Sequence, residues 1–207
     1  MDNRIFGING PVVTVKRAQD LFMQEMVLVG KEKLIGEVIS VADEDTLIQV
    51  YEETAGLTVG EEVIPTGAPL CATLGPGIIG SIFDGIQRPL SVMAQKDGAF
   101  ISRGGDYNSL NAEKEWQVEF VKSVGDKLCG GETFATVKET DSITCKIMLP
   151  PNISGTITKI AKNGQYRVTD KVLSLENEKG ETIELTLQQK WPIRTPRPAK
   201  ERLPLDR

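Results

Sequence analysis

Residues 34–51 read LIGEVISVADEDTLIQVY. Two runs rich in β-branched residues, 34–41 and 46–51, flank the acidic tetrapeptide ADED. Two β-rich runs joined by a short polar connection are typical of a hairpin. The stretch therefore predicts two antiparallel strands and points to a β fold for this part of the chain.

The sequence before this stretch repeats the same pattern. PVVTV follows an Asn9-Gly10 turn signal, and EMVLV is followed by Gly30. Several short strands with turns between them are typical of small barrels and sandwiches. We therefore expect residues 1–70 to form a small N-terminal β-barrel.

Strand signals return in residues 111–186. Asn163-Gly164, between KIAK and QYRV, is a dipeptide preferred in two-residue hairpins. The segment NEKG at 177–180 marks another turn, and the TIELTLQ that follows it alternates with period two. The alternation places Ile183, Leu185 and Leu187 on one face of a strand. These patterns predict a second β domain, a sandwich inserted over residues 111–186.

The segments at 71–110 and 187–207 differ in character from these β regions. Ser81 is a plausible N-cap, and Ile82, Phe83 and Ile86 lie on one face of a short helix that Pro89 would end. A glycine-rich loop, SRGGDYNS, follows and predicts a boundary. The last stretch is basic and contains Pro192, Pro196 and Pro198, which predicts an extended linker.

Composition narrows the possible functions. The 207 residues carry a net charge of −5, which gives no overall attraction to nucleic acid or to an anionic membrane. The absence of histidine excludes Ser-His-Asp triads, Cys-His pairs and most zinc sites. Cys71, Cys129 and Cys145 are far apart, and no secretory signal or apolar run of about 20 residues is present. We expect a cytoplasmic protein with reduced thiols and no segment inserted into a membrane.

Gly75, Gly77 and Gly80 fit the G-x-G-x-x-G pattern of dinucleotide-binding loops. That fingerprint also needs a helix and an acidic residue about 20 positions on, for which Asp97 is available. Pro76, however, removes a backbone N–H group from the loop, and Pro89 cuts the helix short. The expected structure is a tight turn that leads into a short packed helix, with no cofactor bound.

Residues 121–175 resemble the biotinyl/lipoyl carrier fold. The resemblance rests on VGDK, on Glu139-Thr140-Asp141 and on PNISGTI. In lipoyl domains the modified lysine directly follows E-T-D at a hairpin tip, but here Ser142 takes that place and Lys146 lies four residues further on. A serine hydroxyl cannot form the amide that holds lipoate, so the resemblance implies the fold without the carrier chemistry.

Together the segments resemble the catalytic A chain of V/A-type rotary ATPases. The residues that carry the resemblance include NGPVVTV, LIGEVISV, GPGIIGSIFDGIQRPL, LPPNISGTI and LQQKWPIRTPRPAKERLP, in the family's order over nearly the whole chain. The resemblance implies a mainly β fold: the barrel at 1–70, a connector with a short helix from an incomplete α/β domain at 71–110, a biotinyl/lipoyl-like bulge at 111–186, and a return linker at 187–207.

No catalytic, cofactor-binding or metal-binding residue follows from this resemblance. No G-x-x-x-x-G-K-[ST] motif is present in the 207 residues, and in the family the phosphate loop lies further along the sequence. The chain alone is therefore expected to be inactive, with Mg-ATP bound only by the full-length protein. Ile78, Ile79, Ile82, Phe83 and Ile86 would pack the missing domain, so we expect them to be exposed here or to cover the bulge.

The resemblance also implies partners and a location. Three A chains would alternate with three ATPase B subunits, with the barrels forming a ring and the bulge meeting the peripheral stalk, on a cytoplasmic assembly peripheral to a membrane. ATP hydrolysis or synthesis would be coupled to transport of H⁺ or Na⁺. Two alternatives stay open: a stand-alone non-catalytic interaction module, and a biotinyl/lipoyl-type carrier.

Overall fold

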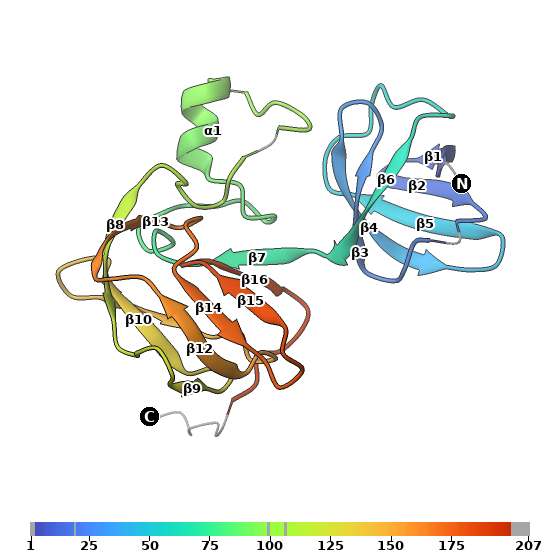
Figure 1. Ribbon diagram of the computed structural model, residues 1–207. Coiled ribbons are helices and arrows are strands. Elements are labelled where there is room, and N and C mark those ends of the chain that lie inside the picture. Colours follow the sequence, from blue (N-terminus) through green and yellow to red (C-terminus); the bar gives the residue numbers. More distant parts are fainter. Residues whose placement is uncertain (1–2, 19, 99, 106, 200–207) are drawn as a thin grey trace, which may run out of the picture. The chain divides into compact units, whose positions relative to one another are not determined.

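The computed structural model describes residues 3–18, 20–98, 100–105 and 107–199. The described chain is mostly β structure with one helix, as expected. It divides into two compact units. The first takes in Met1–Cys71 and Leu90–Tyr107, and the second Ala72–Pro89 and Asn108–Arg207. Figure 1 shows the elements of each unit.

The first unit contains the predicted β-barrel. Its antiparallel sheet has the order β1-β2-β5-β4-β3-β6. The two outer strands also meet: Arg4 and Glu62 form a β-bridge, and the Ile5 N–H donates to the Glu61 carbonyl at 2.9 Å. These contacts close the sheet, and closure leaves few unpaired strand edges. The strands are β1 (Ile5–Asn9), β2 (Val12–Lys16), β3 (Glu25–Val29), β4 (Leu34–Val41), β5 (Asp45–Val50) and β6 (Val63–Pro69).

The local turn signals predicted the barrel hairpins correctly. The hairpin expected at 34–51 is the pair β4–β5, with Val38 opposite Ile48. The Asn9-Gly10 turn joins β1 to β2, and Gly10 has a φ of 56°, a conformation that favours glycine. Alternate residues of these strands point inward and, together with Leu21 from the β2–β3 connection, form one buried apolar core: Ile5, Val13, Val15, Val27, Val29, Leu34, Val38, Ile48, Val50 and Val63.

The second unit contains the predicted sandwich, whose two four-stranded sheets have the orders β11-β10-β8-β13 and β15-β14-β12-β9 (Figure 1). A two-stranded sheet of β7 (Cys71–Leu74) and β16 (Gln189–Pro192) accompanies them. The sandwich strands are β8 (Glu115–Phe120), β9 (Lys127–Leu128), β10 (Thr133–Lys138), β11 (Thr144–Met148), β12 (Gly155–Ile160), β13 (Gly164–Arg167), β14 (Leu173–Glu176) and β15 (Thr182–Leu185).

One of the two predicted sandwich hairpins is wrong. The Asn177 turn joins β14 to β15 as expected, and the Asn177 side chain accepts hydrogen bonds from the N–H groups of Lys179 and Glu181. Asn163-Gly164, in contrast, leads from β12 into β13, and these strands belong to different sheets. The Asn163 side chain accepts the Phe120 N–H of β8 at 2.9 Å, so the dipeptide starts a crossing between sheets.

The predicted helix at 81–88 is also wrong. These residues form turns, and the helix of the structure, α1 (Leu90–Asp97), begins directly after Pro89. Two physical reasons account for the difference. The Asp84 carboxylate accepts the N–H groups of Ile86 and Arg88, which competes with helical hydrogen bonding. Pro89 disfavours helical backbone at Arg88 but is suited to the first turn of a helix.

The expected connector at 71–110 is shared between the two units. Residues 72–89 belong with the sandwich, and 90–107 belong with the barrel. Arg103 forms an ion pair with Glu32 at 2.6 Å and donates to the Ala55 carbonyl at 2.5 Å, which attaches its loop to the barrel. The expected linker at 187–207 contributes β16 and the buried Leu187 to the sandwich unit, and residues 200–207 lie outside the described part.

Candidate functional site

The GPGIIG loop at 75–80 is held by a carboxylate of its own chain. Glu139, at the start of the turn between β10 and β11, accepts the N–H of Gly77 at 2.6 Å and the N–H of Ile79 at 3.1 Å. Gly77 and Gly80 have φ values of 105° and 81°, which glycine adopts without strain. Two N–H groups that a phosphate loop would offer to a nucleotide are thus bonded to Glu139.

Further side-chain contacts fix the segment that follows this loop. The Gln87 amide accepts the Thr73 N–H at 2.6 Å and donates to the Thr73 carbonyl at 2.8 Å, as a neighbouring strand would. The Ser81 hydroxyl donates to the Gly77 carbonyl at 2.9 Å. These contacts and the Glu139 bonds hold 75–88 in one irregular but defined conformation, which we call the clasp segment.

The clasp segment also contains a half-buried ion pair between Asp84 and Arg88. The Arg88 Nε lies 2.7 Å from Asp84 Oδ2, and the N–H groups of Ile86 and Arg88 donate to Oδ1. Burial alone would raise the pKa of Asp84, but the hydrogen bonds from Arg88 and Ile86 outweigh it. The pKa of Asp84 therefore lies below its ordinary value.

This shift predicts a pH-dependent contribution to stability. A carboxyl group whose pKa is lowered on folding stabilises the fold above its unfolded pKa of about 4, and the contribution is lost as the pH falls through the folded pKa. Asp84→Asn should lower the free energy of unfolding by about 1 kcal/mol at pH 7. Urea unfolding followed by tryptophan fluorescence checks this, and the difference from wild type should narrow below about pH 4. A difference that stays constant down to about pH 3 would contradict the role given to the charge.

The apolar side chains of the clasp segment behave as expected. Ile79 and Ile82 are 49% and 71% exposed, while Phe83 and Ile86 are half-buried. Ile78 packs partly against the sandwich core. None of the five is fully buried, as expected: two are exposed, and Ile78 covers part of the sandwich. Ile79 and Ile82 are the members most available to another surface.

A groove of about 390 Å³ lies beside the loop in the sandwich unit. Its walls are mainly apolar and include Ile78, Ile147 and Leu187, and its polar residues are Glu139, Lys146, Gln189 and Arg197. Cys145 also lines it, and burial together with the Glu139 charge raises the pKa of that thiol. The arrangement favours binding of an apolar group over nucleophilic chemistry.

The hairpin tip predicted from the lipoyl resemblance is present. The N–H groups of Glu139 and Thr140 donate to the Ile143 carbonyl, so residues 139–143 turn from β10 to β11. Ser142 is exposed at this tip, and Lys146 lies on β11 instead. A lysine is therefore not presented where a lipoyl domain carries its prosthetic group.

The described residues offer little to other kinds of site. Groups of three or more His, Cys, Asp or Glu that could hold a metal are not found in the described part of the chain. The three cysteines are free, with Cys129 exposed and the other two half-buried. Among the described residues, no helix is long and apolar enough to cross a membrane.

Sequence reasoning missed Glu139 as a functional residue. The sequence singles it out only as part of the E-T-D motif, and its partners Gly77 and Ile79 lie 62 and 60 positions away. The acidic residue and the glycine loop are both visible in the sequence, but nothing local joins them. Lys146 and Arg197 were likewise not predicted to line one groove.

Comparisons with known proteins agree with this arrangement of domains. The sequence profile of the ATP synthase alpha/beta family β-barrel domain matches residues 5–67. The profile of the ATP synthase alpha/beta subunit barrel-sandwich domain matches residues 107–194. These two ranges coincide with the barrel and with the sandwich described above.

Curated relatives match along almost the whole chain. The V-type ATP synthase alpha chain of Halothermothrix orenii is 46% identical over 198 residues, which is 96% of this chain and 34% of that protein. The V-type ATP synthase alpha chain 2 of Clostridium tetani is 48% identical over 201 residues, 97% of this chain and 34% of that protein. The corresponding A chain of the A-type ATP synthase of Pyrococcus abyssi is 45% identical over 97% of this chain and 20% of its own length.

The chain thus spans about a third or less of the length of the curated relatives it matches. A solved structure, the ATPase EscN of the enteropathogenic E. coli type III secretion system, covers 42% of this chain with a TM-score of 0.37 and 20% identity. That similarity is too low to add to the evidence from sequence.

Proposed function

Because the chain belongs to the ATP synthase alpha/beta family and is homologous to the N-terminal part of V/A-type A chains, we propose that it is the assembly-forming part of such a protein. The observation that carries the proposal is the identity of about 45–48% over at least 96% of this chain with three such relatives. The order of the two family domains supports it.

The complete A chain would bind Mg-ATP and hydrolyse or synthesise ATP, coupled to H⁺ or Na⁺ transport. Residues 1–207 contain no G-x-x-x-x-G-K-[ST] motif for the phosphates, so the chemistry belongs to another part of that protein. The barrel and the sandwich would provide contacts to B subunits and to a peripheral stalk. The closed barrel suits this role because it is a rigid block with few unpaired edges.

The proposal is tested by the size of the native polypeptide and by the proteins that are recovered with it. An antibody against residues 111–186 would be used to isolate the native protein from source cells, followed by denaturing electrophoresis and an ATPase assay. We expect a band several hundred residues longer than this 22.6 kDa chain, recovered with B subunits and with ATP hydrolysis. A band of 22.6 kDa without ATPase activity would overturn the proposal in favour of a stand-alone interaction module.

The exposed isoleucines provide a second prediction. The double variant Ile79→Ser/Ile82→Ser should change the free energy of unfolding of this chain by less than about 0.5 kcal/mol, because both side chains are largely exposed. The same change in the native-length protein should reduce the yield of assembled ATPase, measured by size-exclusion chromatography. Ile78→Ser is the matched control, since Ile78 packs against the core and its loss should destabilise the chain itself.

A further inference from the structure

Strand β11 forms an edge of the sandwich, and its outer side carries backbone groups directed away from the sheet. It is the terminal strand in the order β11-β10-β8-β13. The N–H of Leu149 and the carbonyl of Ile143 bond toward β10 or its turn. Since successive residues of an antiparallel strand alternate in direction, Thr144 and Lys146 direct their N–H and carbonyl groups outward.

A side chain already pairs with the outer side of β11 at one point. The Gln189 amide donates to the Met148 carbonyl at 3.4 Å, which is the contact that an added strand would make. Next to this edge lies the groove described above, whose apolar walls include Ile78, Ile147 and Leu187. A volume of about 390 Å³ is at the lower end for ligand pockets, and suits the side chains of a short segment.

The groove is lined by two cations, Arg197 and Lys146, and by one carboxylate, Glu139, which is bonded to the N–H groups of Gly77 and Ile79. Neither cation forms an ion pair within the described residues, and Arg197 Nη2 lies 3.5 Å from the Gln189 Oε1 atom. Arg197 stacks on Trp191 at 4.6 Å, and its Nη1 atom is buried without a hydrogen bond. A buried donor without a partner is costly, so the site favours an acceptor supplied from outside.

We propose that the β11 edge and its groove bind an extended segment of a protein partner by strand addition. Main-chain hydrogen bonds to Thr144 and Lys146 would give affinity, and apolar side chains in the groove would give specificity. An acidic side chain or terminal carboxylate of the segment would pair with Arg197 and Lys146. The inference concerns this unit alone and does not depend on the proposed ATPase function.

The positive charge at this edge favours an acidic partner segment over a second copy of the chain. Antiparallel pairing of β11 with itself about its central residue would bring the two Lys146 side chains to facing positions, and like charges at facing positions destabilise a sheet. Lysine on an edge strand commonly prevents such self-association. In a partner segment that alternates acidic and apolar residues, the acidic side chains can pair with Lys146 and Arg197 while the apolar side chains enter the groove.

Fluorescence anisotropy with labelled hexapeptides tests the proposal on the intact 207-residue chain. The probe alternates valine and glutamate, and one control alternates valine and lysine. We expect saturable binding of the acidic probe, binding at least about tenfold weaker for the lysine peptide, and slower hydrogen exchange at the amides of Thr144 and Lys146 on binding. Absence of saturable binding, or equal affinity for the two peptides, would overturn the proposal.

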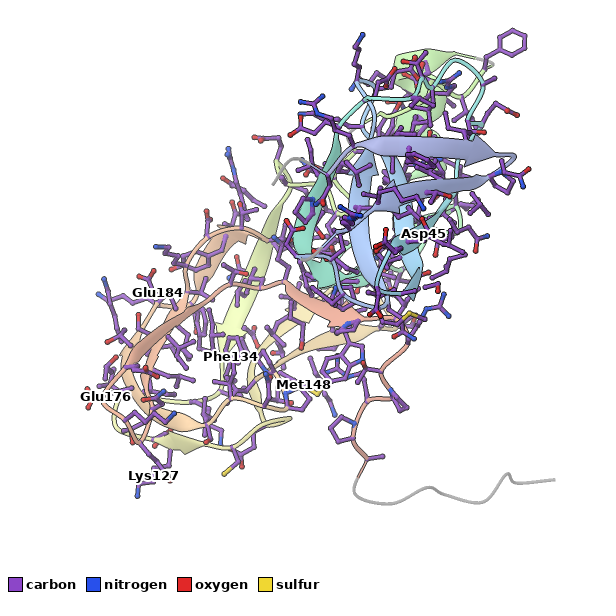
Figure 2. All side chains as sticks on the ribbon, turned by 90° about the vertical axis from the view of Figure 1, so that its right-hand side faces the viewer. Asp45, Lys127, Phe134, Met148, Glu176 and Glu184 are labelled. Carbon is purple, nitrogen blue, oxygen red and sulfur yellow. The ribbon has the colours of Figure 1, made fainter. Side chains whose placement is uncertain are left out.

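Substitutions in the chain test whether the peptide binds at the β11 edge. Lys146→Pro removes an outward N–H without removing a bond to β10 and should abolish binding. Arg197→Gln should weaken it about tenfold through loss of the charged pair. Glu184→Pro is the matched control. Glu184 lies on β15, the edge strand of the other sheet, and by the alternation of the strand its backbone N–H points away from β14. This variant should leave peptide binding unchanged. Figure 2 shows Met148 and Glu184 well apart on the sandwich.

A modified probe covers the case in which Lys146→Pro fails to fold. Methylation of the peptide's backbone nitrogens on one edge leaves its charge and side chains in place and removes its N–H donors. Addition to β11 predicts that one methylated edge of the peptide abolishes binding while the other is tolerated. Full binding by both methylated forms would show that backbone pairing is not used and would overturn strand addition.

Discussion

Phe134→Ala is expected to lower the free energy of unfolding of the sandwich unit by about 3–5 kcal/mol. Phe134 on β10 is 1% exposed and belongs to the apolar core between the two sheets, where Figure 2 labels it. Removal of the ring loses its burial and leaves a cavity that the surrounding strands fill only partly. A loss of this size is a large share of the stability of a domain.

The measurement is urea unfolding followed by tryptophan fluorescence. Both tryptophans, Trp116 and Trp191, lie in the sandwich unit, so their emission reports on it. Val121→Ala is the control, because Val121 is 54% exposed and its truncation should cost less than about 0.5 kcal/mol. A loss below about 1 kcal/mol for Phe134→Ala would show that the core described here is not the core that stabilises the unit.

Glu139→Ala is expected to destabilise the sandwich unit by about 2–3 kcal/mol and to release the GPGIIG loop. The carboxylate accepts two backbone N–H groups, and hydrogen bonds to a charged group contribute about 1.5–3 kcal/mol each in favourable cases. Because Glu139 is only half-buried, the lower part of that range applies. Hydrogen exchange at the Gly77 and Ile79 amides should accelerate together with the loss of stability.

Glu139→Gln separates the charge from the hydrogen bonds. Its amide oxygen can still accept an N–H group, so the loss should be about 1 kcal/mol. Cys145 supplies an independent readout. The pKa of its thiol is raised mainly by burial and, to a smaller extent, by the negative charge of Glu139. Removal of the charge should speed alkylation of Cys145 at a fixed pH, read by peptide mass spectrometry. Unchanged exchange at Gly77 and Ile79 in Glu139→Ala would contradict the contact.

Local patterns predicted the elements whose partners lie nearby in sequence. The hairpin at 34–51, the Asn9-Gly10 turn and the Asn177 turn each join strands only a few residues apart. A turn of the correct type brings such strands together with little loss of chain entropy. The period-two pattern of β15 also depends only on neighbouring residues. Ile183 and Leu185 lie on the more buried face of that strand, as expected.

Two predictions failed where a distant contact outweighed the local preference. Asn163-Gly164 favours a tight hairpin, but Asn163 bonds to Phe120 in β8, 43 residues earlier. The apolar spacing at 81–88 favours a helix, but Asp84 takes the amides that a helix would use, and Gln87 pairs with Thr73. Side-chain hydrogen bonds to the backbone are known to compete with regular structure in this way.

A mainly β protein with a barrel and a sandwich could be predicted from the amino-acid sequence alone, and its resemblance to V/A-type ATPase A chains could be recognised there as well. The fold class follows from periodicity and from turn residues, whereas the family resemblance rests on motifs such as GPGIIGSIFDGIQRPL. The folded structure was needed to show that Glu139 binds the glycine loop, that Arg197 and Lys146 line one groove, and that β11 is an edge strand. Each of these depends on residues tens of positions apart, which meet because the burial of two apolar faces fixes the strand order.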